Sequence, residues 1–159
     1  RRFMMEDDGK DFVMINIIEM NQVPLQIEGV EPGETSDQGL AKYMEYMLPA
    51  MLFRASHPVF SGKAASRRAL DLLNADGMEK WSIAVGVRYR SRRDLIEIAT
   101  DPAFSGRHQF KMAALKKPIA LPVAPFHYLG DPRLILGLLL GLFGCLVGWY
   151  RAHVALSYR

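Results

Sequence analysis

The chain carries a long apolar run near its C-terminal end. Residues 134–150, with the sequence LILGLLLGLFGCLVGWY, contain no charged side chain. At a helical rise of about 1.5 Å per residue the run extends roughly 25 Å, which is close to the hydrocarbon thickness of a bilayer. The sequence therefore predicts one transmembrane helix with an interfacial end over residues 131–156, followed by a short tail over residues 157–159.

Opposite net charges distinguish two parts of the chain. Residues 1–106 carry 13 Lys or Arg against 16 Asp or Glu, whereas residues 107–159 carry 7 against 1. A basic stretch beside an apolar helix suits anionic lipid headgroups, and no basic helix with interleaved aromatic residues points to nucleic acid. A slight excess of basic residues before the helix favours a single-pass protein of the inner (cytoplasmic) membrane with a cytoplasmic soluble domain.

Strand patterns recur between an acidic leader, residues 1–11, and the apolar run. Stretches rich in β-branched and apolar residues predict strands over residues 12–20, 59–63, 81–89 and 118–126. Prolines at positions 118, 122 and 125 remove hydrogen-bond donors from the last of these. We therefore expect that strand at a sheet edge or a bulge.

Helix patterns separate the strands. Apolar residues at spacings of three and four predict a helix over residues 37–52, with Asp37 as its N-cap and Pro49 bending or interrupting it. A short helix is predicted over residues 64–74. Ser91 is expected to cap a further helix that breaks near Asp101 and Pro102 and then resumes toward residue 115.

The order of these elements predicts the fold. Two βαβ halves form a ferredoxin-like α+β domain, here over residues 12–128, in which helices cover one face of a four-stranded antiparallel sheet. The other face of the sheet must be covered too, and apolar strands such as these would need a partner for it. A homodimer through the sheet would provide one.

Several segments resemble a known family. FVMINIIEM, YMEYMLPAM, VFSG and DPAFSGRHQFKMAAL, together with Trp81 leading a strand that ends in RYRS, are similar to the bacterial domain-of-unknown-function family thirteen-thirty, of the dimeric α+β-barrel superfamily. The chain departs from the family in having His57-Pro58 where a Gly-Gly turn is common, and in carrying an apolar helix. The resemblance implies a ferredoxin-like fold and a dimer, and it transfers no catalytic residue.

The resemblance also suggests a pocket. Asn16 and Trp81 are similar to positions that line the pocket of haem-degrading relatives, with His108 as the nearby histidine and Tyr43 on the facing helix. The simpler interpretation is that Asn16 satisfies backbone groups and that Trp81 packs in the core. No cofactor is therefore expected, with haem or another tetrapyrrole as the alternative.

Other side chains suggest a cleft between helix and sheet. Tyr43, Tyr46, His57, Arg88 and Arg90 would supply an acid, a base and an anion anchor if they converged. Amphipathic packing of the tyrosines and an outward strand face for the arginines are the favoured alternative. The histidines lack the paired spacing of metal ligands, so no metal site is predicted.

The apolar helix has its own pattern of small residues. Gly137 and Gly141, and again Gly144 and Gly148, are four residues apart, which lets another helix, a lipid or a pigment approach the backbone. Asp131 is expected to cap this helix. The residues expected at the far membrane interface are Trp149, Tyr150, Arg151 and His153.

Three functional hypotheses follow. The leading one is a non-catalytic accessory subunit of a larger integral-membrane complex of respiratory, photosynthetic or oxidase type, which packs through the glycine-lined helix. The first alternative is a superfamily enzyme of the haem-degrading or cofactor-independent oxygenase type. The second is a membrane-tethered binder of a small ligand.

Overall fold

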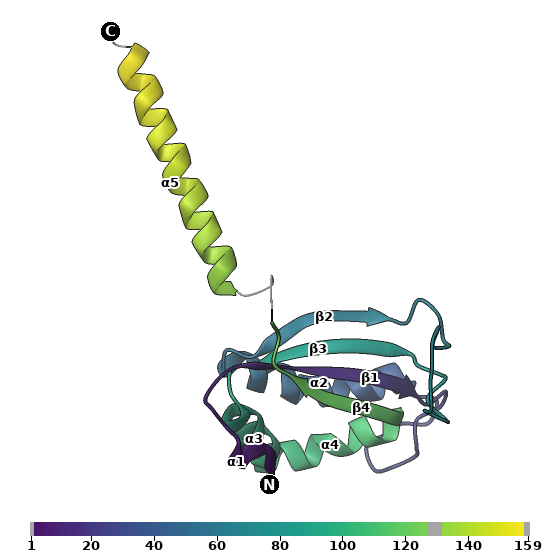
Figure 1. Ribbon diagram of the computed structural model, residues 1–159. Helices are drawn as coiled ribbons and strands as arrows, with labels where there is room; N and C mark the ends of the chain where they lie inside the picture. The colour runs from purple at the N-terminus through teal and green to yellow at the C-terminus, as the bar shows by residue number, and fades with distance from the viewer. Residues whose placement is uncertain (1, 127–131, 158–159) are drawn as a thin grey trace. The chain divides into compact units, whose positions relative to one another are not determined.

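The computed structural model describes residues 2–126 and 132–157. The chain forms two compact units, Arg1–Ala124 and Pro125–Arg159. The elements are α1 (Arg2–Met5), β1 (Phe12–Met20), α2 (Ser36–Phe53), β2 (His57–Lys63), β3 (Ile83–Tyr89), α3 (Arg92–Thr100), α4 (Pro102–Ala114), β4 (Leu115–Val123) and α5 (Pro132–Ser157) (Figure 1).

The first unit has the predicted ferredoxin-like α+β fold. Its four strands form an antiparallel sheet in the order β2-β3-β1-β4. Helices α2, α3 and α4 lie on one face of this sheet (Figure 1). The prediction of an edge position for the proline-containing last strand is confirmed, because β4 pairs only with β1 among the described strands.

The core lies between the sheet and these helices. Every second residue of β1, beginning at Phe12, faces the helices, and Val85, Val87 and Tyr89 do so from β3. Met51 of α2 and Ile98 of α3 are fully buried against this layer. The leader also contributes, since Phe3 of α1 packs edge-on against Phe12 with 5.5 Å between the ring centroids.

The start of α2 corrects one prediction. Thr35, not Asp37, is the N-cap, because its hydroxyl accepts a hydrogen bond from the Gln38 backbone while the Gln38 side chain accepts one from the Thr35 backbone. This reciprocal pair satisfies two donors at once. Pro49 does not interrupt the helix, which continues to Phe53. The proline lacks the N–H that would donate to the Glu45 carbonyl, and the other hydrogen bonds of the helix are enough to carry the chain past it.

The segment predicted as a short helix, residues 64–74, contains no helix. Backbone hydrogen bonds instead tie it to residues 79–82: Ala64 N donates to Ser82 O at 2.8 Å, Trp81 N to Arg67 O at 3.0 Å. The short apolar pattern of this segment was misleading because strand-like pairing with a distant segment satisfies its backbone groups.

Strand ends also differ from the predictions. β2 begins at His57, two residues early, since an edge strand tolerates Pro58. β3 begins at residue 83 rather than 81, and β4 covers residues 115–123 rather than 118–126. The break between α3 and α4 is confirmed: Asp101 caps α4 and Pro102 occupies its first turn. Ser91 caps α3 as predicted.

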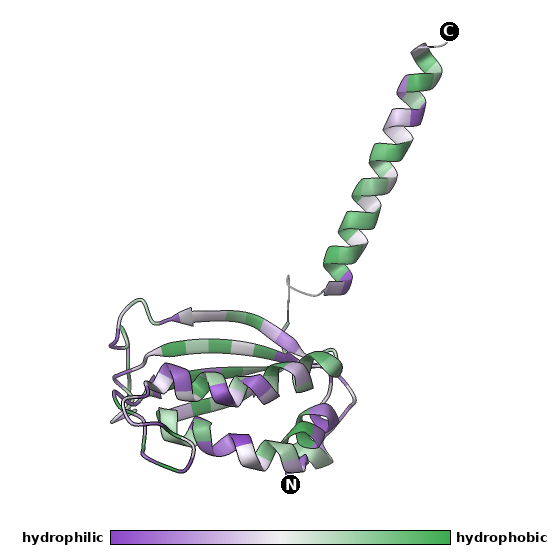
Figure 2. Cartoon of the chain, turned by 180° about the vertical axis from the view of Figure 1, so that it is seen from behind, coloured by the Kyte–Doolittle hydropathy of each residue, from purple (hydrophilic) through white to green (hydrophobic). Residues whose placement is uncertain are grey.

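The second unit contains α5. This helix of 26 residues is long and apolar enough to cross a membrane, and none of its residues is buried. Its apolar residues continue along most of its length (Figure 2). The predicted N-cap, Asp131, lies outside the described residues.

Candidate functional site

A cavity of about 240 Å³ lies between the helices and the sheet. Its walls come from β1, β3, the start of β2, all three covering helices and β4. Most of the lining side chains are apolar, and three of them are methionines of α2, which adapt readily to a ligand's shape. The lining residues are Met14, Asn16, Ile18, Leu40, Tyr43, Met44, Met47, Met51, Pro58, Val85, Val87, Tyr89, Leu95, Ile98, Ala99, Phe104, Lys111 and Ala120.

Asn16 supplies a polar group to the cavity floor. It lies in the middle of β1, on the side that faces the helices, opposite Val85 of β3. Its side-chain amide donates to Met14 O at 3.2 Å. Its amide oxygen makes no hydrogen bond to any residue that the structure describes, so it remains able to accept one from a ligand.

Lys111 is the basic group of the cavity. It lies on α4, and its ammonium group is 5.6 Å from the centre of the Tyr43 ring. Among the described residues it has no carboxylate partner. Burial disfavours the charged form and therefore lowers the pKa of the Lys111 amine. An acidic or carbonyl group of a ligand would find an unpaired cation here.

Two tyrosines remain protonated at neutral pH. Burial raises the pKa of the Tyr89 hydroxyl to about 12. Burial, followed by the neighbouring tyrosines, also raises the pKa of Tyr43. Both hydroxyls can therefore donate a hydrogen bond to a ligand.

His108 lies beside the cavity but does not line it. Its ring stacks on Phe104 with 4.8 Å between centroids and meets Tyr43 edge-on at 6.2 Å. Burial, then the charge of Lys111, lowers the pKa of His108, so the neutral imidazole predominates at pH 7. Packed between two aromatic rings and outside the cavity lining, this imidazole does not fit the role of a haem ligand there.

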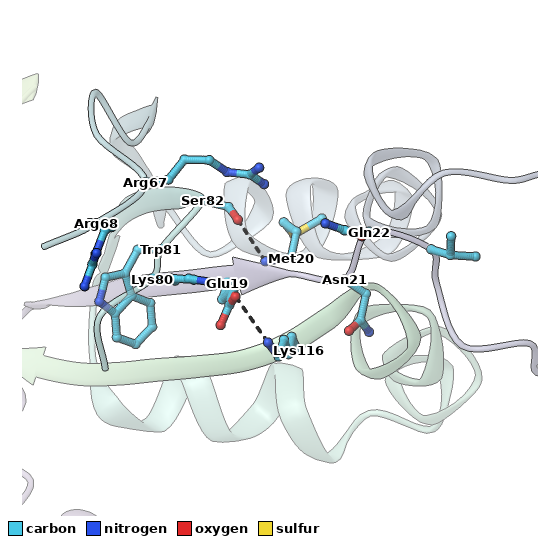
Figure 3. Close-up of a pocket in the computed structure, with 11 residues that line it drawn as sticks. Glu19, Met20, Asn21, Gln22, Arg67, Arg68, Lys80, Trp81, Ser82 and Lys116 are labelled. Atoms are coloured by element: carbon cyan, nitrogen blue, oxygen red, sulfur yellow. Dashed lines mark hydrogen bonds and ion pairs between the residues drawn. The ribbon is translucent and has the colours of Figure 1, made fainter. Parts of the chain in front are cut away.

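The residues of the predicted pocket lie at different places in the structure. Asn16 and Tyr43 both line the cavity. Trp81 lines a separate hollow together with Glu19 and Arg67 (Figure 3). The set of Asn16, Trp81 and His108 proposed from the resemblance is therefore not brought together.

The alternative cleft is not assembled either. Arg88 donates to Asp11 at 2.8 Å and to the Ala55 carbonyl at 3.1 Å, and Arg90 pairs with Asp94 at 2.8 Å. These side chains are occupied by structural partners. In the same way, Tyr46 donates to the Ile98 carbonyl at 3.2 Å, and His57 contacts the Pro58 carbonyl.

Lys111 is a residue of the site that is not among those predicted from the sequence. A signal is present, since Phe104, His108 and Lys111 recur at helical spacing and place one lysine on the same side of α4 as two aromatic rings. A lysine in such a position is unusual because its charge must leave water.

The glycine and interfacial positions lie on α5. Nothing lies within 4 Å of a Cβ built on Gly137, Gly141, Gly144 or Gly148, so each glycine leaves open space on this helix. Trp149 and His153 stack one turn apart, with 5.7 Å between ring centroids. Tyr150 and Arg151 are exposed between them.

Comparisons with known proteins bear on the fold. No family model and no curated protein matches this chain. A protein of unknown function from Rhodopseudomonas palustris, RPA0582, is similar in structure, with a TM-score of 0.63 and 19% identity over 80% of this chain and 91% of that one. Its methylated form gives a TM-score of 0.66 and 18% identity over 79% and 88%. This likeness shows the fold alone.

A more distant structural match is a dimeric protein of unknown function with a ferredoxin-like fold from Bacteroides fragilis. Its TM-score is 0.41, with 14% identity over 72% of this chain and 96% of that one. Membership of family thirteen-thirty stays a prediction, because no family model matches.

Proposed function

We propose that the protein is a membrane-anchored binder of a small, mainly apolar ligand that ends in a carboxylate or another hydrogen-bond acceptor. The cavity between the helices and the sheet carries this proposal. It combines an apolar wall with one unpaired cation, Lys111, and with hydrogen-bonding groups on Asn16 and Tyr43. A site of this kind takes an apolar body and orients it by few polar contacts.

The size of the cavity limits the ligand. At about 240 Å³ it lies below the usual range for drug-sized molecules, roughly 300–1,000 Å³. A short aliphatic or monocyclic acid is therefore favoured over a tetrapyrrole. Such a ligand would gain dispersion contacts with the methionines of α2 and an ion pair with Lys111.

A pairwise comparison of acids and alcohols tests this function. We expect phenylacetate and hexanoate to raise the midpoint of thermal unfolding of the full chain in uncharged detergent more than 2-phenylethanol and hexanol do. Lys111→Met should remove the difference, whereas Lys10→Met, at an exposed lysine that lines neither this cavity nor another described hollow, should retain it. Equal shifts for acids and alcohols, or for both variants, would contradict the proposal.

We infer that α5 crosses the inner membrane once and holds the α+β unit on the cytoplasmic side. The length and composition of α5 and the basic residues that precede it support this placement. Deleting residues 127–159 should move the protein from membranes to the soluble fraction. Leu139→Lys combined with Leu142→Lys should weaken insertion without truncation. Retention of both variants in the pellet after carbonate extraction would contradict the anchor.

We also infer a homodimer through the open face of the sheet. One row across the four strands consists of Phe60, Gly86, Ile15 and Leu121, and a second row contains Ala84, Ile17 and Ile119. Phe60 and Leu121 are 47% and 56% exposed. Neighbouring exposed apolar side chains of this kind favour association with another protein surface. A second copy would supply a matching sheet.

Membership of a larger membrane complex is the second candidate function. The observation in its favour is the spacing of four glycines, Gly137, Gly141, Gly144 and Gly148, along α5. Small residues in this arrangement let a second helix approach the backbone closely. In this hypothesis the whole chain is an accessory subunit of the complex, and it packs against its partners through α5.

A further inference from the structure

A second hollow, of about 660 Å³, lies at one end of the sheet. It is formed where the end of β1 and the start of β4 meet the segment 64–82, which forms no helix (Figure 3). Four cationic side chains line it, against one carboxylate. The charged lining residues are Arg67, Arg68, Lys80, Lys116 and Glu19.

Backbone pairing places Arg68 opposite Lys80, with Arg67 as the next residue along the same segment. Trp81 N donates to Arg67 O at 3.0 Å and Ala69 N to Glu79 O at 2.8 Å. Between these bonds, Arg68 and Lys80 form an antiparallel bridge and lie directly opposite each other. Like charges in this position destabilise a strand pair. An anion between them would offset that cost.

Carboxylates of the protein leave this charge largely uncompensated. Within residues 2–126 and 132–157, the side chains of Arg67, Arg68 and Lys80 form no ion pair or hydrogen bond. Glu19, the carboxylate in the lining, is shared by Lys116 and Lys117, each at 3.4 Å. Glu79, which interacts electrostatically with Arg68, accepts a hydrogen bond from Gly77 N at 3.0 Å.

Trp81 gives the hollow an aromatic wall. Its indole nitrogen donates to Met78 O at 2.7 Å, which fixes the ring, and the ammonium group of Lys117 lies 4.7 Å from the ring centre. Arginine guanidinium groups match phosphate oxygens in pairs, and lysine adds a point charge. The volume exceeds that of a phosphate group alone, which leaves room for an organic part along Trp81.

We propose that this hollow binds a phosphate-bearing anion, either a phospholipid headgroup or a soluble phosphate compound. Arg68 and Lys80, which lie opposite each other, contact the phosphate. Arg67 adds positive charge to the wall of the hollow, and Trp81 borders the rest of the ligand. The site is separate from the cavity that contains Lys111 and does not depend on the function proposed for it.

Fluorescence of Trp81 provides a direct measurement. The chain has two tryptophans, so Trp149→Phe leaves Trp81 as the one reporter. The full chain in uncharged detergent at low salt is titrated with pyrophosphate, dihexanoyl phosphatidylglycerol and dihexanoyl phosphatidylcholine. A saturable change with pyrophosphate supports a soluble ligand. A change with phosphatidylglycerol alone supports a lipid headgroup. An equal change with the zwitterionic lipid, or none with either anion, overturns the proposal.

Charge-matched variants separate a site from general attraction. Arg67→Gln, Arg68→Gln and Lys80→Gln together should weaken binding by at least about tenfold, since charge-assisted contacts are lost. The control combines Arg2→Gln, Lys10→Gln and Arg107→Gln, which removes three exposed cations elsewhere. The control should bind like the parent. Equal weakening in both sets overturns the proposal, and circular dichroism verifies that both remain folded.

Discussion

The ammonium group of Lys111 lies 5.6 Å from the centre of the Tyr43 ring, so the one cation of the inner cavity is held against an aromatic face. The attraction between the ammonium group and the ring face offsets part of the hydration free energy that the cation loses on burial. The residues come from α4 and α2, and the contact therefore joins the two helices beside the cavity. A charge kept here at a cost in stability is typical of a binding group.

Lys111→Met should stabilise the fold while it removes acid binding. We expect a gain of about 1 kcal/mol in the free energy of unfolding at pH 7, the usual size for a stabilising substitution. Because burial lowers the pKa of Lys111, the unfolded chain binds more protons below the ordinary lysine value of 10.5. The advantage of the variant should therefore shrink as the pH rises toward 10. Denaturant unfolding at pH 7 and pH 10 measures this difference, and an advantage that grows with pH would contradict it.

His108 should make the fold sensitive to mild acid. Its pKa is lowered by burial, so below pH 6.5 the unfolded chain takes up a proton that the folded chain resists. Stability should then fall as the pH decreases from 7 to 5, by an amount of order 1 kcal/mol or less. His108→Gln should lose this dependence of stability on pH. His153→Gln, at an exposed histidine of α5, is the control and should keep it. An unchanged acid response in the variant would exclude His108 as its source.

The sequence predicted the framework better than the site. Alternation along β1 and the capping residue Ser91 act locally, so both could be recognised from short patterns. The segment 64–74 was mistaken for a helix because its partners, residues 79–82, lie beyond a turn and only pairing in space decides its structure. The same pairing in space decides the position of Trp81, which lines the second hollow and not the cavity that contains Asn16.

The cavity itself could be predicted only in part. Asn16 and Tyr43 were singled out, and both line it. Lys111 was missed because a single lysine in an amphipathic pattern usually points to solvent. Whether the lysine points to solvent depends on how α4 packs against α2. The packing of the two helices is a tertiary property that no short sequence pattern shows.

Leu121→Glu should separate the proposed dimer. Leu121 lies beside Ile15 on the open face of the sheet and is 56% exposed, so a carboxylate there is tolerated by one copy but opposed by apolar surface in a dimer. We expect the dissociation constant to rise by about tenfold or more, equivalent to ~1.4 kcal/mol. Light scattering on size-exclusion peaks in detergent measures the mass. Leu70→Glu, at a 97% exposed leucine of the segment 64–82, is the matched control. Equal masses for the two variants would argue against this interface.

Gly141→Leu with Gly144→Leu should release a partner helix while leaving insertion intact. Leucine fits lipid as well as glycine does, but its side chain fills the open space along α5 and should cost about 1 kcal/mol or more of helix packing. The measurement is recovery of co-purifying membrane proteins with the tagged full chain, compared with the parent. Leu139→Phe with Leu146→Phe adds bulk elsewhere on α5 and serves as the control. Loss of partners in the glycine variant alone supports the accessory-subunit hypothesis, because only the approach to the glycine face has changed. Unchanged recovery, together with loss of acid binding in Lys111→Met, would instead leave the inner cavity as the functional part of the molecule.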